Sequence, residues 1–191
     1  MKAAIIISTV IISLSAIALA GNLSGEKNEQ TIRPGKFYGL IVNSGSNVIL
    51  TQGNENTFRI DCDQTERGKI SAEIENGALV IRGKGVSHAT VYVTVKDLNL
   101  IDVNGNGRVF VSGSINSDIL LMKVNDHGSI CADIEAMKVG LMAKDSGKII
   151  VSGRANESFV QLLGDAVIYQ KGLDINYVNE VRNTIRSGNE N

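Results

Sequence analysis

The chain has 191 residues, of which 43% are hydrophobic and 4% aromatic, and its formal net charge is −1 at pH 7. This length is enough for one domain with a sizeable apolar core. The near-neutral charge provides no basic surface for nucleic acid or an anionic membrane, so neither is expected as a partner. Gly, Asn, Asp and Ser separate short Val- and Ile-rich runs, which indicates many short strands joined by tight turns.

The N-terminus has the pattern of a secretory signal peptide over residues 1–20. Lys2 is followed by a mostly apolar stretch, and Ala18-Leu19-Ala20 then places small residues before Gly21. This pattern predicts cleavage between Ala20 and Gly21. An uncleaved anchor is the alternative, but the apolar stretch is short for a span and no charged stop follows it. We expect an exported protein (periplasmic, at the cell surface or secreted) with no membrane span after cleavage.

The predicted mature chain has three parts. Residues 21–35 are polar and expected to be flexible, residues 36–173 form the body, and residues 174–191 form a polar cap or tail. Within the body, five stretches superpose when each is anchored on the last residue of a turn. The anchors are Ser46, Gly107, Gly128, Gly147 and Ala166, and the last four are 21, 19 and 19 residues apart.

Three positions relative to the anchor are apolar in all five copies. Six residues before the anchor they are Leu40, Ile101, Met122, Leu141 and Val160; four before it, Val42, Val103, Val124, Ala143 and Leu162; two after it, Val48, Val109, Ile130, Ile149 and Ile168. Such alternation on both sides of a turn indicates two strands with one buried face. A unit of about 20 residues must stack on its neighbours to bury that face. We therefore predict an all-β, right-handed, single-stranded β-helix or β-solenoid; an antiparallel sandwich of hairpins is the alternative.

Residues 70–98 break this repeat. The segment AEIENGALVIR has apolar alternation on both sides of Asn76-Gly77, which is a strong signal for a two-residue β-hairpin. We interpret the segment as a hairpin inserted into the same body.

Four segments in order resemble a known family. They are FYGLIVNSGSNVILTQGN, AEIENGALVIR, VYVTVKDLNLIDVNGNG and the later NDHG and KDSG turns, which together span residues 36–172. They resemble the auto-transporter adhesin head GIN domain of exported Bacteroidetes-type proteins, although Lys96 stands where family members often have Pro. The resemblance implies a β-helical fold and an adhesin-like setting in the cell envelope, and it supplies no catalytic residue.

Polar residues gather at the predicted turns and form one candidate binding corner: Asn104, Asp126, His127, Asp145 and Asp165. Three stacked carboxylates could hold Ca²⁺ or act as an acid and base on a polysaccharide. The structural explanation is that Asn and Asp accept left-handed backbone and cap turns. His127 and His88 have no second ligand at metal-binding spacing, and no nucleophile or phosphate-binding motif occurs. We expect no catalytic residue, metal or cofactor.

A second candidate lies three residues after each anchor. Ile49, Phe110, Cys131, Ile150 and Tyr169 are apolar although the alternation places them opposite the core. A contiguous exposed apolar stripe marks an interface; the alternative is that another part of the chain, such as the 70–98 segment, covers it. Cys131 and Cys62 either form a disulfide in an oxidising compartment or remain buried thiols.

Three functions follow as hypotheses. The favoured one is an adhesin-like envelope protein that binds a glycan or protein partner and could form a homo-oligomer. The second is a polysaccharide-active β-helix enzyme that uses Asp126, Asp145 and Asp165. The third is a purely structural surface component.

Overall fold

Twelve strands form a single sheet in the computed structural model, which describes residues 31–86, 88–170 and 172–183. These residues contain no helix, and so none that could cross a membrane. The predicted signal peptide, its cleavage point and residues 21–30 lie outside the described residues. The strands are β1 (Gly39–Asn43), β2 (Asn47–Gln52), β3 (Thr57–Asp61), β4 (Ile70–Glu75), β5 (Ala78–Gly83), β6 (Thr90–Val95), β7 (Leu100–Asn104), β8 (Arg108–Val124), β9 (Ser129–Ala143), β10 (Lys148–Leu163), β11 (Val167–Tyr169) and β12 (Leu173–Asn183).

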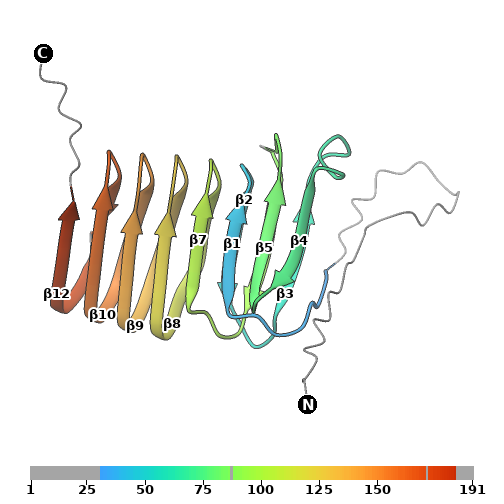
Figure 1. The fold of residues 1–191 in the computed structure, drawn as a ribbon. Helices are drawn as coiled ribbons and strands as arrows, with labels where there is room; N and C mark the ends of the chain where they lie inside the picture. The colour runs from blue at the N-terminus through green and yellow to red at the C-terminus, as the bar shows by residue number, and fades with distance from the viewer. Residues whose placement is uncertain (1–30, 87, 171, 184–191) are drawn as a thin grey trace, which may run out of the picture.

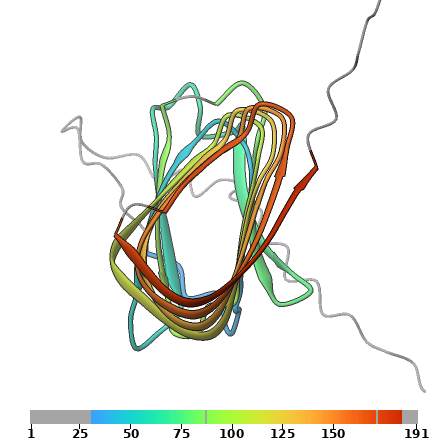
Figure 2. The same cartoon turned by 90° about the vertical axis from the view of Figure 1, so that its left-hand side faces the viewer.

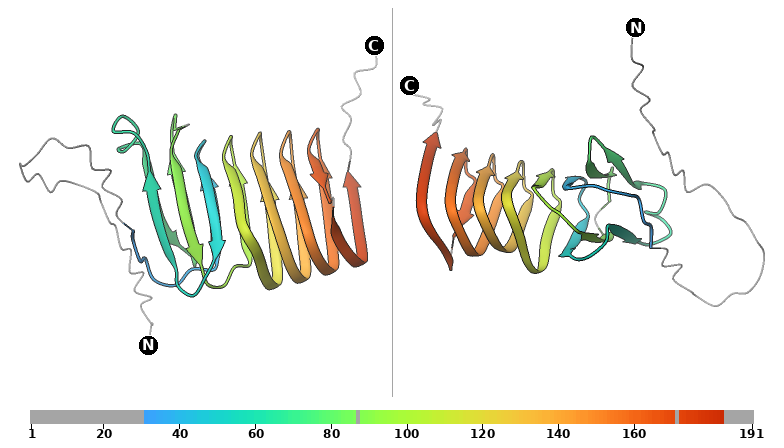
Figure 3. Two further views of the ribbon diagram at one scale, coloured as in Figure 1. Left: turned by 180° about the vertical axis from the view of Figure 1, so that it is seen from behind. Right: turned by 90° about the horizontal axis from the view of Figure 1, so that it is seen from below.

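Most of the sheet is parallel and is curled around one interior. Figure 1 shows the strands side by side along the molecule, and Figure 2, which looks along the row, shows them following one another around a common outline. β12 lies at one end of the row, and β4 with β3 lies at the other (Figure 3). The parallel pairs β7·β8, β8·β9 and β9·β10 exclude the antiparallel sandwich of hairpins.

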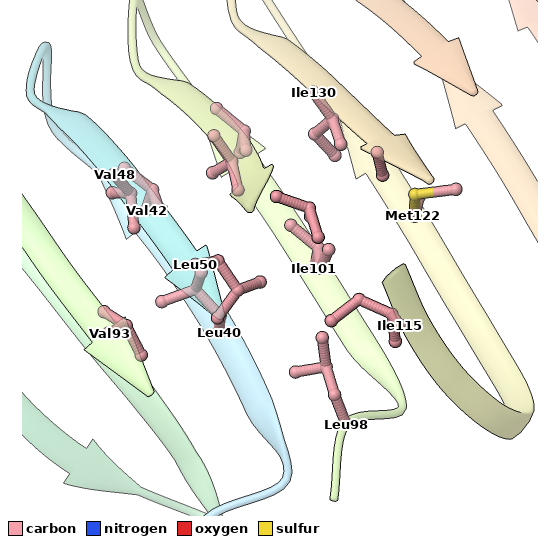
Figure 4. Close-up of a cluster of buried hydrophobic side chains, with 14 of the residues drawn as sticks. Leu40, Val42, Val48, Leu50, Val93, Leu98, Ile101, Ile115, Met122 and Ile130 are labelled. Carbon is pink, nitrogen blue, oxygen red and sulfur yellow. The ribbon is translucent and has the colours of Figure 1, made fainter. Parts of the chain in front are cut away.

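The three predicted apolar columns pair in register. Leu40 is opposite Ile101, which is opposite Met122, and the other two columns continue in the same way. Every column member is buried except Leu162 and Ile168, which are partly buried and pack against the core. Figure 4 shows part of these columns, including Leu40, Ile101 and Met122, in the interior enclosed by the curled sheet. We call each strand, its turn and the next strand a rung.

Rungs are spaced unequally along the chain because extra residues are absorbed within the strands. Arg108 pairs with Ser129, a step of 21, whereas Ser114 pairs with Asp133, a step of 19. The two additional residues lie in the irregularity between Phe110 and Ser114, where Gly113 has a φ of 89°. Such a bulge lets the strand change length locally without shifting the buried faces of its neighbours.

The spatial order of the rungs departs from their order in the chain at one place. β1 lies between β5 and β7, and β2 lies between β6 and β8. The later rung β5–β6 therefore stacks on the outer side of β1–β2, and the chain returns past β1–β2 to begin β7.

This order corrects the interpretation of residues 70–98 as only an inserted hairpin. The hairpin is present as antiparallel β4 and β5, with Asn76 and Gly77 at φ 50° and 78°. However, β5 and β6 also form a rung of their own. Its core residues align with the three columns: Leu79 with Leu40, Ile81 with Val42, and Val91 with Val48. A longer connection, residues 84–89, hides this copy in the sequence.

The two ends of the body are formed by short antiparallel or terminal strands. At one end β3 pairs antiparallel with β6, and Ile32 bridges to Phe58. At the other end β12 continues parallel to β10 as far as Asn183, within the segment expected to be a polar cap or tail. The ordered sheet therefore extends ten residues beyond residue 173.

We predict that Ser158→Val raises stability. Ser158 is 2% exposed, its Oγ atom has no hydrogen-bond partner, and it lies between Val139 and Val178. A buried unsatisfied hydroxyl costs about 1–3 kcal/mol, so its removal should raise the melting temperature. Ser158→Ala tests the same loss without added volume. The control is Ser44→Val, because buried Ser44 is hydrogen-bonded to Ser46 (Oγ to Oγ, 2.6 Å); this change should lower the melting temperature. A lower melting temperature for both Ser158 variants would contradict the prediction.

Candidate functional site

The predicted apolar stripe is a continuous outward row on the sheet. Register pairs join Ile49 to Phe110, Phe110 to Cys131, Cys131 to Ile150 and Ile150 to Tyr169. The row begins one strand earlier than predicted, because Tyr92 of the unrecognised β5–β6 rung pairs with Ile49. We call the six residues from Tyr92 to Tyr169 the apolar ladder.

The apolar ladder is open to solvent in the part of the chain that the structure describes. Phe110 is 54% exposed, Tyr169 49% and Ile150 36%, while the other members are partly buried. The β4–β5 hairpin does not lie over it, because β5 pairs edge to edge with β1 in the same sheet. The strands of the 70–98 segment therefore lengthen the sheet and do not cover the ladder.

Cations lie along the ladder. The Arg59 guanidinium carbon is 4.4 Å from the centre of the Tyr92 ring, and Lys148 Nζ is 5.1 Å from the centre of the Tyr169 ring. Both distances are within the range of cation–π attraction. Exposed Arg108 precedes Phe110 by two residues in the same strand, so both project from the same face. The ladder thus combines apolar surface with positive charge.

Backbone geometry explains two residues of the polar corner. Asp126 and Asp145 have φ values of 57° and 59°, and Gly105 and Gly164, at the same position in neighbouring turns, have 83° and 70°. This conformation favours Gly and, among other residues, Asn and Asp. The turns are also joined to one another: the Asp126 Oδ2 atom accepts a hydrogen bond from the Gly105 N–H at 3.0 Å, and the Ser146 N–H donates to the Asp126 carbonyl at 2.8 Å.

The three acids do not share one position in their turns. Gly164, not Asp165, stacks on Asp145. The evidence is that a Cβ atom added to Gly164 would be 3.2 Å from the Asp145 Cα atom. Asp165 is one position further on, at the turn position of His127 and Ser146. Among the described residues, no cluster of three His, Cys, Asp or Glu side chains could hold a metal ion. Asp126 and Asp145 therefore stack in neighbouring turns, and Asp165 is offset from them by one residue.

Asn104 belongs to a hydrogen-bonded row that the sequence only partly indicated. Its Nδ2 group donates to Asn43 Oδ1 at 2.9 Å, and its Oδ1 atom accepts from Asn125 Nδ2 at 2.7 Å. All three asparagines occur three residues before their anchors, which is the signal that would have revealed the row. These amides bond to one another across neighbouring strands, so their first role is to tie the rungs together.

The two cysteines are free thiols. Cys131 is on β9, four strands from β3, and Cys62 directly follows β3. Four strand spacings amount to about 19 Å, whereas a disulfide requires Cα atoms within about 7 Å. The disulfide raised as an alternative is therefore excluded within one chain. Burial raises the pKa of the Cys62 thiol, with nearby Arg67 acting in the opposite direction.

The sequence model of one family matches residues 36–189, and its description is "Putative auto-transporter adhesin, head GIN domain". The chain belongs to this family. The family resemblance drawn from the four segments is thereby confirmed. No curated protein matches the chain in sequence.

Three solved structures of similar fold come from Parabacteroides species. A "putative adhesin" from Parabacteroides distasonis has a TM-score of 0.63 at 18% identity, covering 82% of this chain and 78% of its own. A "putative adhesin" from Parabacteroides merdae has 0.62 at 16%, covering 81% and 76%. A "putative lipid binding protein" from P. distasonis has 0.61 at 13%, covering 81% and 77%. At these identities the likeness establishes the fold, and the family supports an adhesin-like role.

We predict that Asp145 is required for its conformation and not for its charge. Asp145→Gly should leave the melting temperature nearly unchanged, because Gly adopts the same φ of 59° freely. Asp145→Val should destabilise by about 1–2 kcal/mol, the cost of a left-handed residue. The control is Ser146→Val in the same exposed turn, outside the positive-φ position. Equal stability of the two valine variants in chemical denaturation would contradict this explanation.

We also predict that both thiols stay reduced in protein produced in an oxidising compartment. Thiol titration after unfolding without reductant should give two thiols per chain. In the folded protein, the raised pKa of Cys62 leaves more of it protonated at neutral pH, so its alkylation should be slow and should accelerate at higher pH. The Cys62→Ala variant isolates Cys131 for comparison. A titration that finds no thiol in the monomer would contradict the separation of the two residues.

Proposed function

We propose that this protein is an exported, adhesin-like binding protein of the bacterial cell envelope that carries out no catalysis. The observation that carries the proposal is the exposed apolar ladder on the body of an adhesin-head family member. A contiguous apolar surface of this kind is costly to leave in water unless a partner uses it. The partner would be a glycan or a protein.

The body that presents the ladder is proposed to be a right-handed, single-stranded β-helix. Its support is the register of successive parallel pairs, whose steps are 21 residues between Arg108 and Ser129 and 19 between Ser129 and Lys148. Crossover connections between parallel strands are right-handed in nearly all proteins. Such a body holds outward residues at a constant spacing of about 4.8 Å from rung to rung, which suits a rigid display surface.

Export is supported by the sequence pattern of residues 1–21, with cleavage after Ala20, and by the envelope setting of the family. The presence of two unpaired thiols is compatible with export, because Cys62 and Cys131 are too far apart to react with each other within one chain. Whether the protein acts in the periplasm, at the surface or outside the cell is tested by fractionation and by protease treatment of intact cells.

The binding proposal is tested by placing charge on the ladder. Phe110→Glu combined with Tyr169→Glu should abolish retention of the purified protein on immobilised bacterial envelopes, because carboxylates replace the two most exposed aromatic rings of the ladder. The matched control is Phe159→Glu, since Phe159 is 42% exposed but lies in another outward row, opposite Gly140. Circular dichroism confirms that each variant is folded.

Unchanged retention of the folded double variant would refute the ladder as the binding surface. Loss of retention in the Phe159→Glu control to the same degree would show a general surface effect. If the wild-type protein is retained by no envelope and instead forms a concentration-dependent oligomer in light scattering, the purely structural function is favoured.

A further inference from the structure

We propose that the apolar ladder binds a linear anionic polysaccharide that runs along the row of strands. This inference rests on the proposed binding function and names the chemistry of its ligand. Three properties of the ladder lead to it: its area, its shape and the placement of its cations.

The area of the ladder is too small for a stable protein–protein interface. Six residues on neighbouring strands give five spacings, or about 24 Å, and three outward positions along a strand add about 13 Å of width. The product is roughly 300 Å², and generous margins bring it to roughly 500 Å². A stable interface buries about 800 Å² on each partner. A second copy of the chain or a globular partner would therefore need surface beyond the ladder.

The shape of the ladder suits an extended chain. Its members follow a straight register line across β6, β2, β8, β9, β10 and β11. Aromatic rings occur at both ends and in the middle, at Tyr92, Tyr169 and Phe110. The apolar C–H face of a sugar ring packs on an aromatic side chain, and the hydroxyl groups of Tyr supply hydrogen bonds beside it. A polysaccharide repeats such faces along a line, as the ladder does.

The cations are positioned to contact acidic groups on that chain. Arg59 lies over Tyr92, Lys148 lies near Tyr169, and Arg108 lies between them beside Phe110. The row that contains Arg108 and Lys148 also contains Asn47 and Ser129, which are hydrogen-bonding residues. Its acidic member is Asp61 at the far end, opposite Thr90.

A second outward row lies on the other side of the ladder, two residues further along each strand. Among its described residues it carries one carboxylate, Asp133, which accepts a hydrogen bond from Ser152 Oγ at 2.8 Å. The excess of cations therefore lies on the Arg108 side. Guanidinium and ammonium groups form charge-assisted hydrogen bonds with carboxylates and sulfates. A polymer of uronic acids or sulfated sugars fits this combination of ring faces and cations, whereas a neutral glucan would use only the rings.

Binding to polygalacturonate and to dextran, measured by biolayer interferometry, tests the inference. The wild-type protein should bind polygalacturonate more tightly than dextran, and the difference should decrease with added salt. Arg108→Gln combined with Lys148→Gln should weaken polygalacturonate binding roughly tenfold and leave dextran binding unchanged. Phe110→Ala combined with Tyr169→Ala should weaken binding to both polymers.

Matched controls lie on other rows of the sheet. They are Phe159→Ala and Lys138→Gln, the latter removing an exposed lysine that pairs with Glu157 at 2.9 Å. Both should bind polygalacturonate within about twofold of the wild type. The same variants are compared by circular dichroism and thermal melting, so that loss of fold is recognised.

Two outcomes would overturn the inference and leave the proposed function in place. The first is retention on envelopes that depends on Phe110 without measurable binding to polygalacturonate. The second is equal affinity for polygalacturonate and dextran that the double glutamine variant does not change. A stable wild-type dimer that becomes monomeric when Phe110 is changed to Glu would also overturn it, because the ladder would then be covered by a second copy. If envelope retention fails as well, the proposed function fails with it.

Discussion

The structure depends on the in-register stacking of small apolar side chains from rung to rung. One rung of about 20 residues exposes both edges of its strands and one apolar face, so it has no interior of its own. Each of the columns begun by Leu40, Val42 and Val48 is buried only because the next rung supplies the same kind of residue at the same position. The backbone hydrogen bonds between rungs hold that register. The same register fixes the distance between outward residues on neighbouring strands, including those of the apolar ladder.

This dependence explains which features could be predicted from the sequence. The three columns follow from alternation with a period of two residues, and the turns and the Asn76-Gly77 hairpin follow from short local motifs. The structure places all of them as predicted. The rung β5–β6 was missed because its connection is longer than the other turns, so Val91 fell outside the expected offset. The position of β1–β2 between two later rungs depends on which strands pair with each other, and no local sequence pattern indicates that.

The candidate sites were predicted unequally for a related reason. The outward row from Ile49 to Tyr169 was found because apolar residues at solvent-facing positions break the alternation. The acidic corner was a less specific signal, because Asp serves both chemistry and left-handed turns. The φ values of Asp126 and Asp145, and the presence of Gly at the same position in two other turns, assign these acids to the turns. The cations beside Tyr92 and Tyr169 depend on side-chain placement between strands and could not be derived from spacing.

The position of β1–β2 between two later rungs has a consequence for how the protein assembles when its chain becomes available from the N-terminus. The rungs that follow β7–β8 pair only with the rungs before and after them in the chain, so each can be added as its residues become available. The first rung cannot be completed in that way. Its two neighbours are β5–β6 and β7–β8, so it remains exposed until residues as far as Val111 have arrived. The N-terminal half of the body therefore forms as one cooperative unit, and the rest can grow from it as a series of additions.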